Sequence, residues 1–255
     1  MEKKVYFEDS RGIDLCGILS DPTSDKSKPL IILCHGFGTS KNGHTYLRLQ
    51  TFFNQSDLST FRFDFFGHGE SGGDLGKVTV SEAVDDILNA LAFVQGQGYE
   101  RIGVVGSSFG GLSSMVAVSK SDDVLVLALK SPVSDYVEAE KMRLGEEGIR
   151  RWKEEGYVQL EDFPGGVKLE YSFFEDLKNN LGYSAAKEID ISTLIVHGEQ
   201  DDVVPVEQSK KAASIIQDCE LEIIEGADHR YSNPEHFNKM IQLISQFILS
   251  HSLES

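Results

Sequence analysis

The sequence has few cysteines and no long apolar run. Its 255 residues include three cysteines, Cys16, Cys34 and Cys219, whose spacing fits neither a zinc site nor a redox motif. An odd number of cysteines among apolar neighbours predicts buried thiols in a reducing compartment. The longest apolar run, residues 124–129, is far too short to span a bilayer.

Basic residues are also scarce, with 24 Lys and Arg against 41 Asp and Glu, a formal net charge of −17. Such a surface repels phosphate backbones and anionic lipid, so we expect no nucleic-acid binding and no stable membrane association. The N-terminus turns acidic where a signal peptide would be apolar, which predicts a cytoplasmic protein. The charge leaves the substrate open, and the sequence leaves the oligomeric state open, a homodimer being possible.

What the sequence does contain is a regular alternation of short apolar runs and amphipathic stretches. The predicted strands are residues 3–7, 14–19, 29–34, 59–64, 101–106, 124–130, 193–197 and 220–224. Helical spacing predicts helices at 80–95, 109–119, 207–216 and 235–249, and Ser81 is a candidate N-cap of the first. This alternation predicts an α/β protein with a doubly wound, mostly parallel, eight-stranded sheet and an antiparallel hairpin at one edge.

Residues 131–189 interrupt the alternation. They show no strand-like run, but they include a charged helical stretch at 139–155 and a break at Pro164-Gly165-Gly166. We therefore predict a core of residues 1–130 and 190–255, with 131–189 as a helical cap over one end of the sheet. The cap contains eight aromatic residues: Tyr136, Trp152, Tyr157, Phe163, Tyr171, Phe173, Phe174 and Tyr183.

Two pentapeptides fit the pattern G-x-S-x-G, centred on Ser71 and Ser108. The Ser71 match lies in a glycine-rich loop with no strand before it and no helix after it. The Ser108 match lies where a buried strand turns into a helix, which is the context in which this pattern exposes a nucleophilic serine. A phosphate loop or a plain tight turn is the alternative interpretation of the Ser108 match.

A serine hydroxyl needs a base to take its proton, and the base needs an orienting partner. Asp201 follows the strand predicted at 193–197, and His229 follows the last predicted strand. All three residues are therefore expected at the carboxyl ends of strands, where open α/β sheets place their sites. The order Ser108, Asp201, His229 is the nucleophile, acid and base order of this kind of fold.

Several motifs together resemble the serine α/β-hydrolases. The chain is similar to the branch that holds carboxylesterases, cinnamoyl (feruloyl) esterases, monoglyceride lipases and the serine aminopeptidase family. The resemblance rests on five segments, 35–38 (HGFG), 64–71 (DFFGHGES), 106–110 (GSSFG), 197–205 (HGEQDDVVP) and 226–229 (GADH).

The resemblance implies Ser108 as the nucleophile, His229 as general base and then acid, and Asp201 as the residue that orients it. Asp201 is preferred to Asp202 and Asp228 because the family's acid stands four residues after the histidine that ends its strand, here His197. The family's oxyanion hole would be formed by the backbone N–H groups of Phe37 and Phe109.

The other histidines are expected to be structural or exposed. We expect His35 and His68 to be hydrogen-bonding residues of their loops, and His197 to support the loop that carries the acid. His44, His236 and His251 are expected at the surface. No cluster has the spacing of a metal site, and we expect no cofactor.

These observations predict a serine carboxylesterase that acts on short-to-medium or aromatic acyl esters, feruloyl-type esters among them. The alternatives are a peptidase or amidase, with Asp135, Glu138 or Glu140 recognising an amine, a monoacylglycerol-type lipase, and a binding protein without catalysis. The charged stretch at 139–155 leaves only a narrow apolar face, which argues against a lipid-surface lid. Arg230, next to His229, is expected to pair with a surface acid rather than with a substrate carboxylate.

Overall fold

A computed structural model describes residues 1–161, 163 and 166–253. As the alternation predicted, eight strands form one sheet. In spatial order they are β1 (Glu2–Glu8), β2 (Asp14–Ser20), β4 (Ser59–Phe63), β3 (Leu30–Cys34), β5 (Ile102–Ser107), β6 (Val124–Lys130), β9 (Thr193–Gly198) and β10 (Cys219–Ile224). β1 pairs antiparallel with β2 and β2 with β4, whereas all the other neighbours are parallel. The mostly parallel sheet with a hairpin at its edge is thus confirmed.

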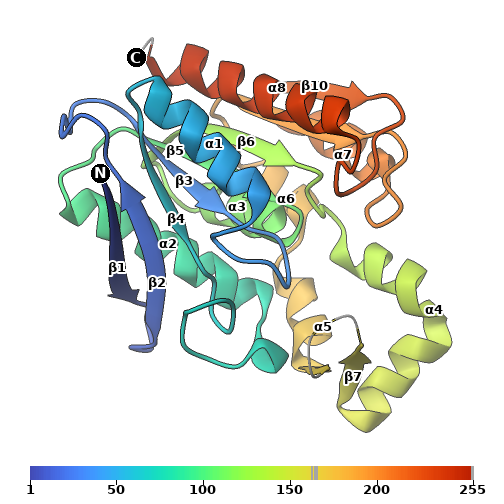
Figure 1. The fold of residues 1–255 in the computed structure, drawn as a ribbon. Helices are drawn as coiled ribbons and strands as arrows, with labels where there is room; N and C mark the ends of the chain where they lie inside the picture. Colours follow the sequence, from blue (N-terminus) through green and yellow to red (C-terminus); the bar gives the residue numbers. More distant parts are fainter. Residues whose placement is uncertain (162, 164–165, 254–255) are drawn as a thin grey trace.

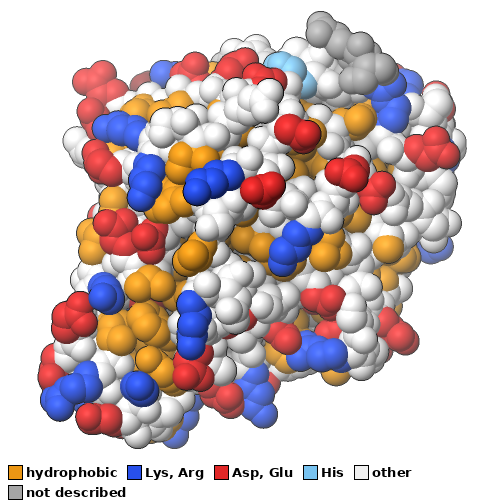
Figure 2. Space-filling model, turned by 180° about the vertical axis from the view of Figure 1, so that it is seen from behind, with side chains coloured by type: hydrophobic (Ala, Val, Ile, Leu, Met, Phe, Trp, Pro, Cys, Tyr) orange, Lys and Arg blue, Asp and Glu red, His pale blue; other side chains and the backbone are white. Residues whose placement is uncertain are grey.

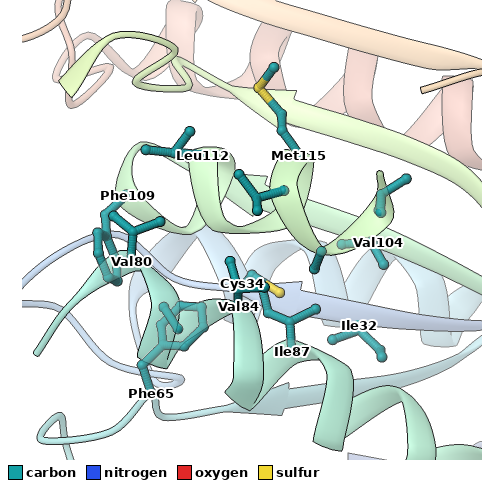
Figure 3. Close-up of a cluster of buried hydrophobic side chains, with 14 of the residues drawn as sticks. Ile32, Cys34, Phe65, Val80, Val84, Ile87, Val104, Phe109, Leu112 and Met115 are labelled. Atoms are coloured by element: carbon teal, nitrogen blue, oxygen red, sulfur yellow. The ribbon is translucent and has the colours of Figure 1, made fainter. Parts of the chain in front are cut away.

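Helices cover both faces of the sheet (Figure 1). α1 (His44–Gln55) and α8 (Pro234–Leu253) pack on one face. The other face holds α2 (Val80–Gly96), α3 (Phe109–Val118) and α7 (Val206–Ala213). The central strand β3 shows why both faces are covered, because its five residues are all buried and alternate between the two hydrophobic cores. Ile31 and Leu33 contribute to the α1/α8 core, and Ile32 contributes to the α2/α3 core drawn in Figure 3.

Two local features differ from the expectations. α1 was not predicted. Its buried residues Tyr46, Leu49 and Phe53 do have helical spacing, but no side chain caps its first turn, so no residue marks its start. The predicted N-cap of α2 was wrong: Thr79 caps the helix by accepting a hydrogen bond from the Glu82 N–H at 3.1 Å, and Ser81 instead contacts Asp176.

The 131–189 segment follows the carboxyl end of β6. Its elements are α4 (Tyr136–Glu155), β7 (Tyr157–Leu160), β8 (Val167–Glu170), α5 (Ser172–Asp176), the 3₁₀ turn η2 (Leu177–Asn179) and α6 (Gly182–Ala186). Of these, α4, β7 and α5 lie at the lower right of Figure 1. β7 and β8 pair as an antiparallel hairpin, so the expectation of no strand here was wrong. Each run is only four residues long, which is too short to give a clear period-two pattern. Pro164 and Gly165 of the predicted break lie outside the described residues.

Charged side chains of both signs are interspersed over the face shown in Figure 2, which is the view from behind Figure 1. In the lower left of that view an apolar area is bordered by Lys and Arg side chains. Among the described residues, no helix is long and apolar enough to cross a membrane.

Candidate active site

Ser108 stands on a sharp turn between β5 and α3. Its backbone has a φ of 53° and a ψ of −115°, a combination that L-residues rarely adopt and that costs about 1–3 kcal/mol. The turn also requires glycine on both sides, since a Cβ on Gly106 would collide with the Gly110 carbonyl and one on Gly110 with the His35 carbonyl. The strained backbone of this turn therefore places the Ser108 hydroxyl at the carboxyl edge of the sheet.

Ser71, the serine of the other G-x-S-x-G match, makes hydrogen bonds that hold its loop in place. Ser71 lies in the loop after β4, where its Oγ donates to the Asp64 carbonyl at 2.5 Å and accepts from the Cys16 N–H at 2.9 Å. Both contacts tie this loop to neighbouring backbone. The strand-to-helix context thus separated the two matches as expected.

The structure brings Ser108, His229 and Asp201 together. His229 Nε2 lies 3.2 Å from Ser108 Oγ, and His229 Nδ1 lies 2.6 Å from Asp201 Oδ2. Because an ionised carboxylate can only accept, Nδ1 carries the proton and Nε2 presents its lone pair to the serine hydroxyl. This is the tautomer that a base needs if it is to deprotonate Ser108.

Asp201 is held by several donors at once. The Val203 and Val204 N–H groups donate to its Oδ1 at 3.0 and 2.8 Å, and His197 Nε2 lies 3.1 Å from its Oδ2. Burial alone would raise the pKa of Asp201, but hydrogen bonds from His197 and His229 outweigh it and hold that pKa well below its usual range. The carboxylate therefore stays ionised next to His229.

The neighbouring acids do not contact His229. Asp202 is exposed, and Asp228 accepts a hydrogen bond from the Ser232 N–H at 2.8 Å. His197 contacts Ser209 Oγ through Nδ1 at 2.6 Å and the Val204 carbonyl through Nε2 at 3.0 Å, so it braces the acid loop as expected. The part played by Ser209 could not be predicted, since a serine on a helix carries no signal by itself.

A buried lysine also contacts the base. Lys130, the last residue of β6, donates from Nζ to the His229 carbonyl at 2.7 Å, and burial lowers the pKa of Lys130 to about 8. Burial also lowers the pKa of His229; Asp201 opposes this effect, and the Lys130 charge adds to it. Lys130 was not among the predicted site residues. A charged residue that ends the apolar strand VLVLALK indicates that its side chain has a role at the sheet edge, but not that it contacts His229.

Two backbone N–H groups next to Ser108 are free to bind an oxygen. Neither the Phe37 nor the Phe109 N–H donates a hydrogen bond to any residue that the structure describes. The Phe109 N–H belongs to the first turn of α3, where the helix dipole favours negative charge. The Phe37 segment is close by, because a Cβ on Gly36 would lie 3.5 Å from the Ser108 Cβ.

His35 and His68 fix the loop that carries Phe37. His35 Nε2 accepts from the Phe65 N–H at 3.1 Å, and His68 Nε2 accepts from the Gly38 N–H at 3.0 Å. The Nδ1 atom of each ring donates to a backbone carbonyl, at 2.8 and 2.9 Å respectively. Burial lowers the pKa of both rings, so they stay neutral and structural, as expected.

A cavity of about 1540 Å³ opens over Ser108 and His229. On the side of the 131–189 segment its walls are largely apolar and aromatic: Val133, Tyr136, Leu160, Phe163, Leu169 and Phe173. On the side of α1 and α8 the walls are more polar: His44, Arg48, Arg230, Ser232, Phe237 and Asn238. The two sides of the cavity thus offer different chemistry to the two ends of a substrate.

Comparison with known proteins identifies the family. The model of the alpha/beta hydrolase family matches residues 31–238. The chain belongs to this family. The mitochondrial palmitoyl-protein thioesterase ABHD10 of Mus musculus is 25% identical over 226 residues, which cover 86% of this chain and 75% of that protein.

Solved structures show the same fold. The esterase Est1E from Butyrivibrio proteoclasticus, with ferulic acid bound, matches with a TM-score of 0.84 and 26% identity, covering 97% of this chain and 98% of that one. Mouse alpha/beta hydrolase domain-containing protein 10 matches with a TM-score of 0.82 and 22% identity, covering 97% and 99% of the two chains. These matches extend over the 131–189 segment as well as the sheet.

One acidic cluster of this hydrolase has the proximity that a metal site needs. Among the described residues, only Asp9, Asp85 and Asp86 bring three possible ligand atoms within 4.8 Å of one another. Arg11 and Ser10 already donate to Asp9 and Asp85, and none of the three acids lines the cavity. The cluster therefore takes no part in the site around Ser108.

Arg230 of the hydrolase departs from what we expected. Its side chain is exposed and lines the cavity. The expected surface ion pair is absent among the residues that the structure describes. Arg230 thus remains available to a ligand of the cavity.

Proposed function

We propose that the protein is a serine hydrolase that cleaves carboxylic esters or thioesters through an acyl-enzyme. The observation that carries the proposal is the hydrogen-bonded series from Ser108 through His229 to Asp201. Beside the serine are two N–H groups that donate to none of the described residues. The family match and the esterase and thioesterase names of its relatives support the same reaction class.

In the first step, His229 Nε2 takes the Ser108 proton while Oγ attacks the carbonyl carbon of the substrate. The Asp201 carboxylate stabilises the imidazolium that forms. The Phe37 and Phe109 N–H groups bind the developing oxyanion, a contribution of about 3–4 kcal/mol for each donor.

In the second half, His229 returns the proton to the leaving oxygen or sulfur and the alcohol or thiol departs. The same imidazole then takes a proton from water, whose oxygen attacks the acyl-enzyme and releases the acid. Lys130 positions His229 by donating to its carbonyl. The Lys130 charge lowers the pKa of His229 and so keeps the imidazole neutral, ready to accept a proton, before each attack.

For the acyl group we propose a short-to-medium aliphatic or an aromatic chain, lying against the walls from the 131–189 segment. Phe163 and Phe173 of that wall contact the Phe37 ring, with centroids 5.9 and 6.0 Å apart. Feruloyl-type acids fit an aromatic wall, and ferulic acid is the ligand named for Est1E. A panel of p-nitrophenyl and methyl esters that varies acyl length and aromaticity tests this choice.

The acids that could recognise a peptide amine are already engaged. Asp135 caps α4, Glu138 accepts from Gln208 at 2.8 Å, and Glu140 is paired with Arg143. These contacts favour an ester or thioester over a peptide. The charged side chains of α4 also fit a soluble substrate better than a lipid surface.

The test compares p-nitrophenyl butyrate with butyryl-4-nitroanilide. We expect the wild-type protein to hydrolyse the ester much faster than the anilide, and we expect Ser108→Ala to abolish turnover while keeping its circular dichroism spectrum. Ser71→Ala, the matched change in the other G-x-S-x-G segment, should retain turnover. Full activity in Ser108→Ala would overturn the proposal.

For location we propose the cytoplasm, on the strength of the free thiols of Cys16 and Cys34, which are both buried. The mouse relative is named as mitochondrial, so the alternative is a different reducing compartment. Fractionation of cells that express the native protein separates the two.

A further inference from the structure

The arginines of this acidic chain fall into two groups. Five of the eight have a partner: Arg11, Arg62, Arg143 and Arg150 lie in ion pairs, and Arg101 donates to the Ser252 carbonyl. Arg48, Arg151 and Arg230 make neither an ion pair nor a side-chain hydrogen bond with any described residue. Although the chain has 41 acidic residues, these three cations have no ion-pair partner within the described part of the chain.

Two of the three unpaired arginines line the same cavity. Arg48 lies on α1, one turn after His44, and Arg230 lies just before α8. α1 and α8 lie side by side in Figure 1, and the His44 ring stacks on the Phe237 ring of α8 with centroids 4.6 Å apart. Both arginines therefore belong to the α1/α8 side of the cavity, opposite the aromatic wall.

The acidic groups of the cavity do not neutralise these two arginines. Asp202 is exposed and forms no ion pair with a described residue, and Glu140 is paired with Arg143 on the other side. Glu161, the remaining described acid of the lining, belongs to the 131–189 segment. The α1/α8 side thus carries two arginines that form no ion pair with a described residue, in a chain whose net charge is −17.

The position of His229 decides which end of a substrate meets these arginines. If the proposed function holds, His229 Nε2 must contact the leaving oxygen or sulfur in order to protonate it. Arg230 is the next residue in the chain, so it flanks the leaving group rather than the acyl group. The aromatic wall from the 131–189 segment remains for the acyl chain.

We propose that the α1/α8 side of the cavity is a subsite for an anionic group, a carboxylate or a phosphate, carried by the leaving alcohol or thiol. Arg48 and Arg230 are its ligands, because a guanidinium offers paired donors that match the geometry of both anions. This inference rests on the proposed function and narrows its substrate class.

The test uses three phenyl butyrates that share the acyl group and differ in the para substituent. The butyrate ester of 4-hydroxybenzoate carries a carboxylate, that of 4-hydroxybenzamide is its neutral isostere, and that of 4-hydroxyphenyl phosphate carries a phosphate. The measured quantity is the ratio of kcat/KM for each anionic ester to kcat/KM for the amide. We expect a ratio of about 10 or more in the wild-type protein, since charge-assisted hydrogen bonds at a partly exposed site have about this effect.

Arg48→Gln and Arg230→Gln should each lower that ratio by about tenfold, whereas Arg151→Gln should keep the wild-type ratio. Arg151 is the matched control, because it too lacks an ion-pair partner among residues 1–161, 163 and 166–253 but does not line the cavity. The anion with the higher ratio identifies the favoured group, and the preference should weaken as salt is added.

The outcomes separate this inference from the proposed function. If all three esters are hydrolysed and the wild-type ratios are near one, the subsite is wrong and the proposed function stands. A preference for the anions that survives in both Arg48→Gln and Arg230→Gln also overturns the subsite. If none of the three esters is hydrolysed although p-nitrophenyl butyrate is, the subsite is wrong and the proposed function stands; if p-nitrophenyl butyrate is not hydrolysed either, both proposals fall.

Discussion

The carboxyl edge of the sheet and the 131–189 segment are held together by different interactions, hydrogen bonds in the first and aromatic packing in the second. At the sheet edge, polar groups are fixed by several partners each: Asp201 accepts from two backbone N–H groups and two imidazoles. In the segment, aromatic rings pack on one another, as Phe173 does on Trp152, and most charged side chains face solvent. The strand ends thus fix the chemistry, while the segment shapes one wall of the cavity.

This difference indicates which part of the molecule can be mutated to change the acyl preference without loss of hydrolysis. A polar group at the sheet edge has little freedom, since its partners define a single geometry and tautomer. The rings of the segment can be exchanged for others of similar volume at a smaller cost. We therefore expect changes at the sheet edge to affect the rate, and changes in the segment to affect stability and acyl preference.

The largest effect is expected for Asp201→Asn. An amide in place of the carboxylate favours the wrong tautomer of His229, so kcat for an activated ester should fall about 10⁴-fold. Asp202→Asn, the same change one residue later, should lower kcat by no more than about twofold, because Asp202 forms neither a hydrogen bond nor an ion pair with His229. Equal losses in the two variants would contradict the assignment of Asp201.

The second effect concerns stability rather than rate. Phe173 is 1% exposed and packs against the rings of Phe109, Tyr136 and Trp152. Phe173→Ala should lower the free energy of unfolding by about 3–5 kcal/mol, measured by urea denaturation. The neighbouring, half-buried Phe174 contacts the rings of Trp152 and Tyr171 from the edge of this cluster, so Phe174→Ala should cost less. An equal loss would contradict the central place of Phe173.

A third effect is a shift of the pH profile. The pKa of His229 lies below its usual value of 6.5. As His229 loses its proton, kcat/KM should therefore rise with pH to a plateau, and the midpoint of the rise should lie below pH 6.5. Lys130→Met removes a positive charge that lowers this pKa, and the midpoint should move to higher pH. Lys120→Met, an exposed lysine, should leave the midpoint in place. A midpoint that moves to lower pH in Lys130→Met would contradict the electrostatic role.

The smallest effect is expected at the solvent face of α4. Arg150 pairs with Glu147, and both side chains are more than half exposed. Because exposed ion pairs contribute little, Arg150→Ala should change the free energy of unfolding by no more than about 0.5 kcal/mol. A loss of several kcal/mol in urea denaturation would mean that charge pairs, rather than aromatic packing, hold the segment.

The sequence predicted the sheet well because buried parallel strands have consecutive apolar residues, as in β3 and β5. It also predicted that Ser108, Asp201 and His229 would meet, since each follows a strand of one parallel sheet. It did not reveal α1, whose first turn has no side-chain cap to mark it, or the β7–β8 hairpin, whose runs are too short. The contact between Lys130 and His229 joins residues 99 positions apart, and no local pattern predicts it.

The central claim is that Ser108 is the nucleophile, and covalent labelling tests it most directly. The wild-type protein would be treated with a fluorophosphonate, digested, and mapped by mass spectrometry. We predict one adduct per chain, on the peptide that contains Ser108, and no adduct in Ser108→Ala. An adduct on another serine, or continued ester hydrolysis by a protein that takes up no label, would contradict the account.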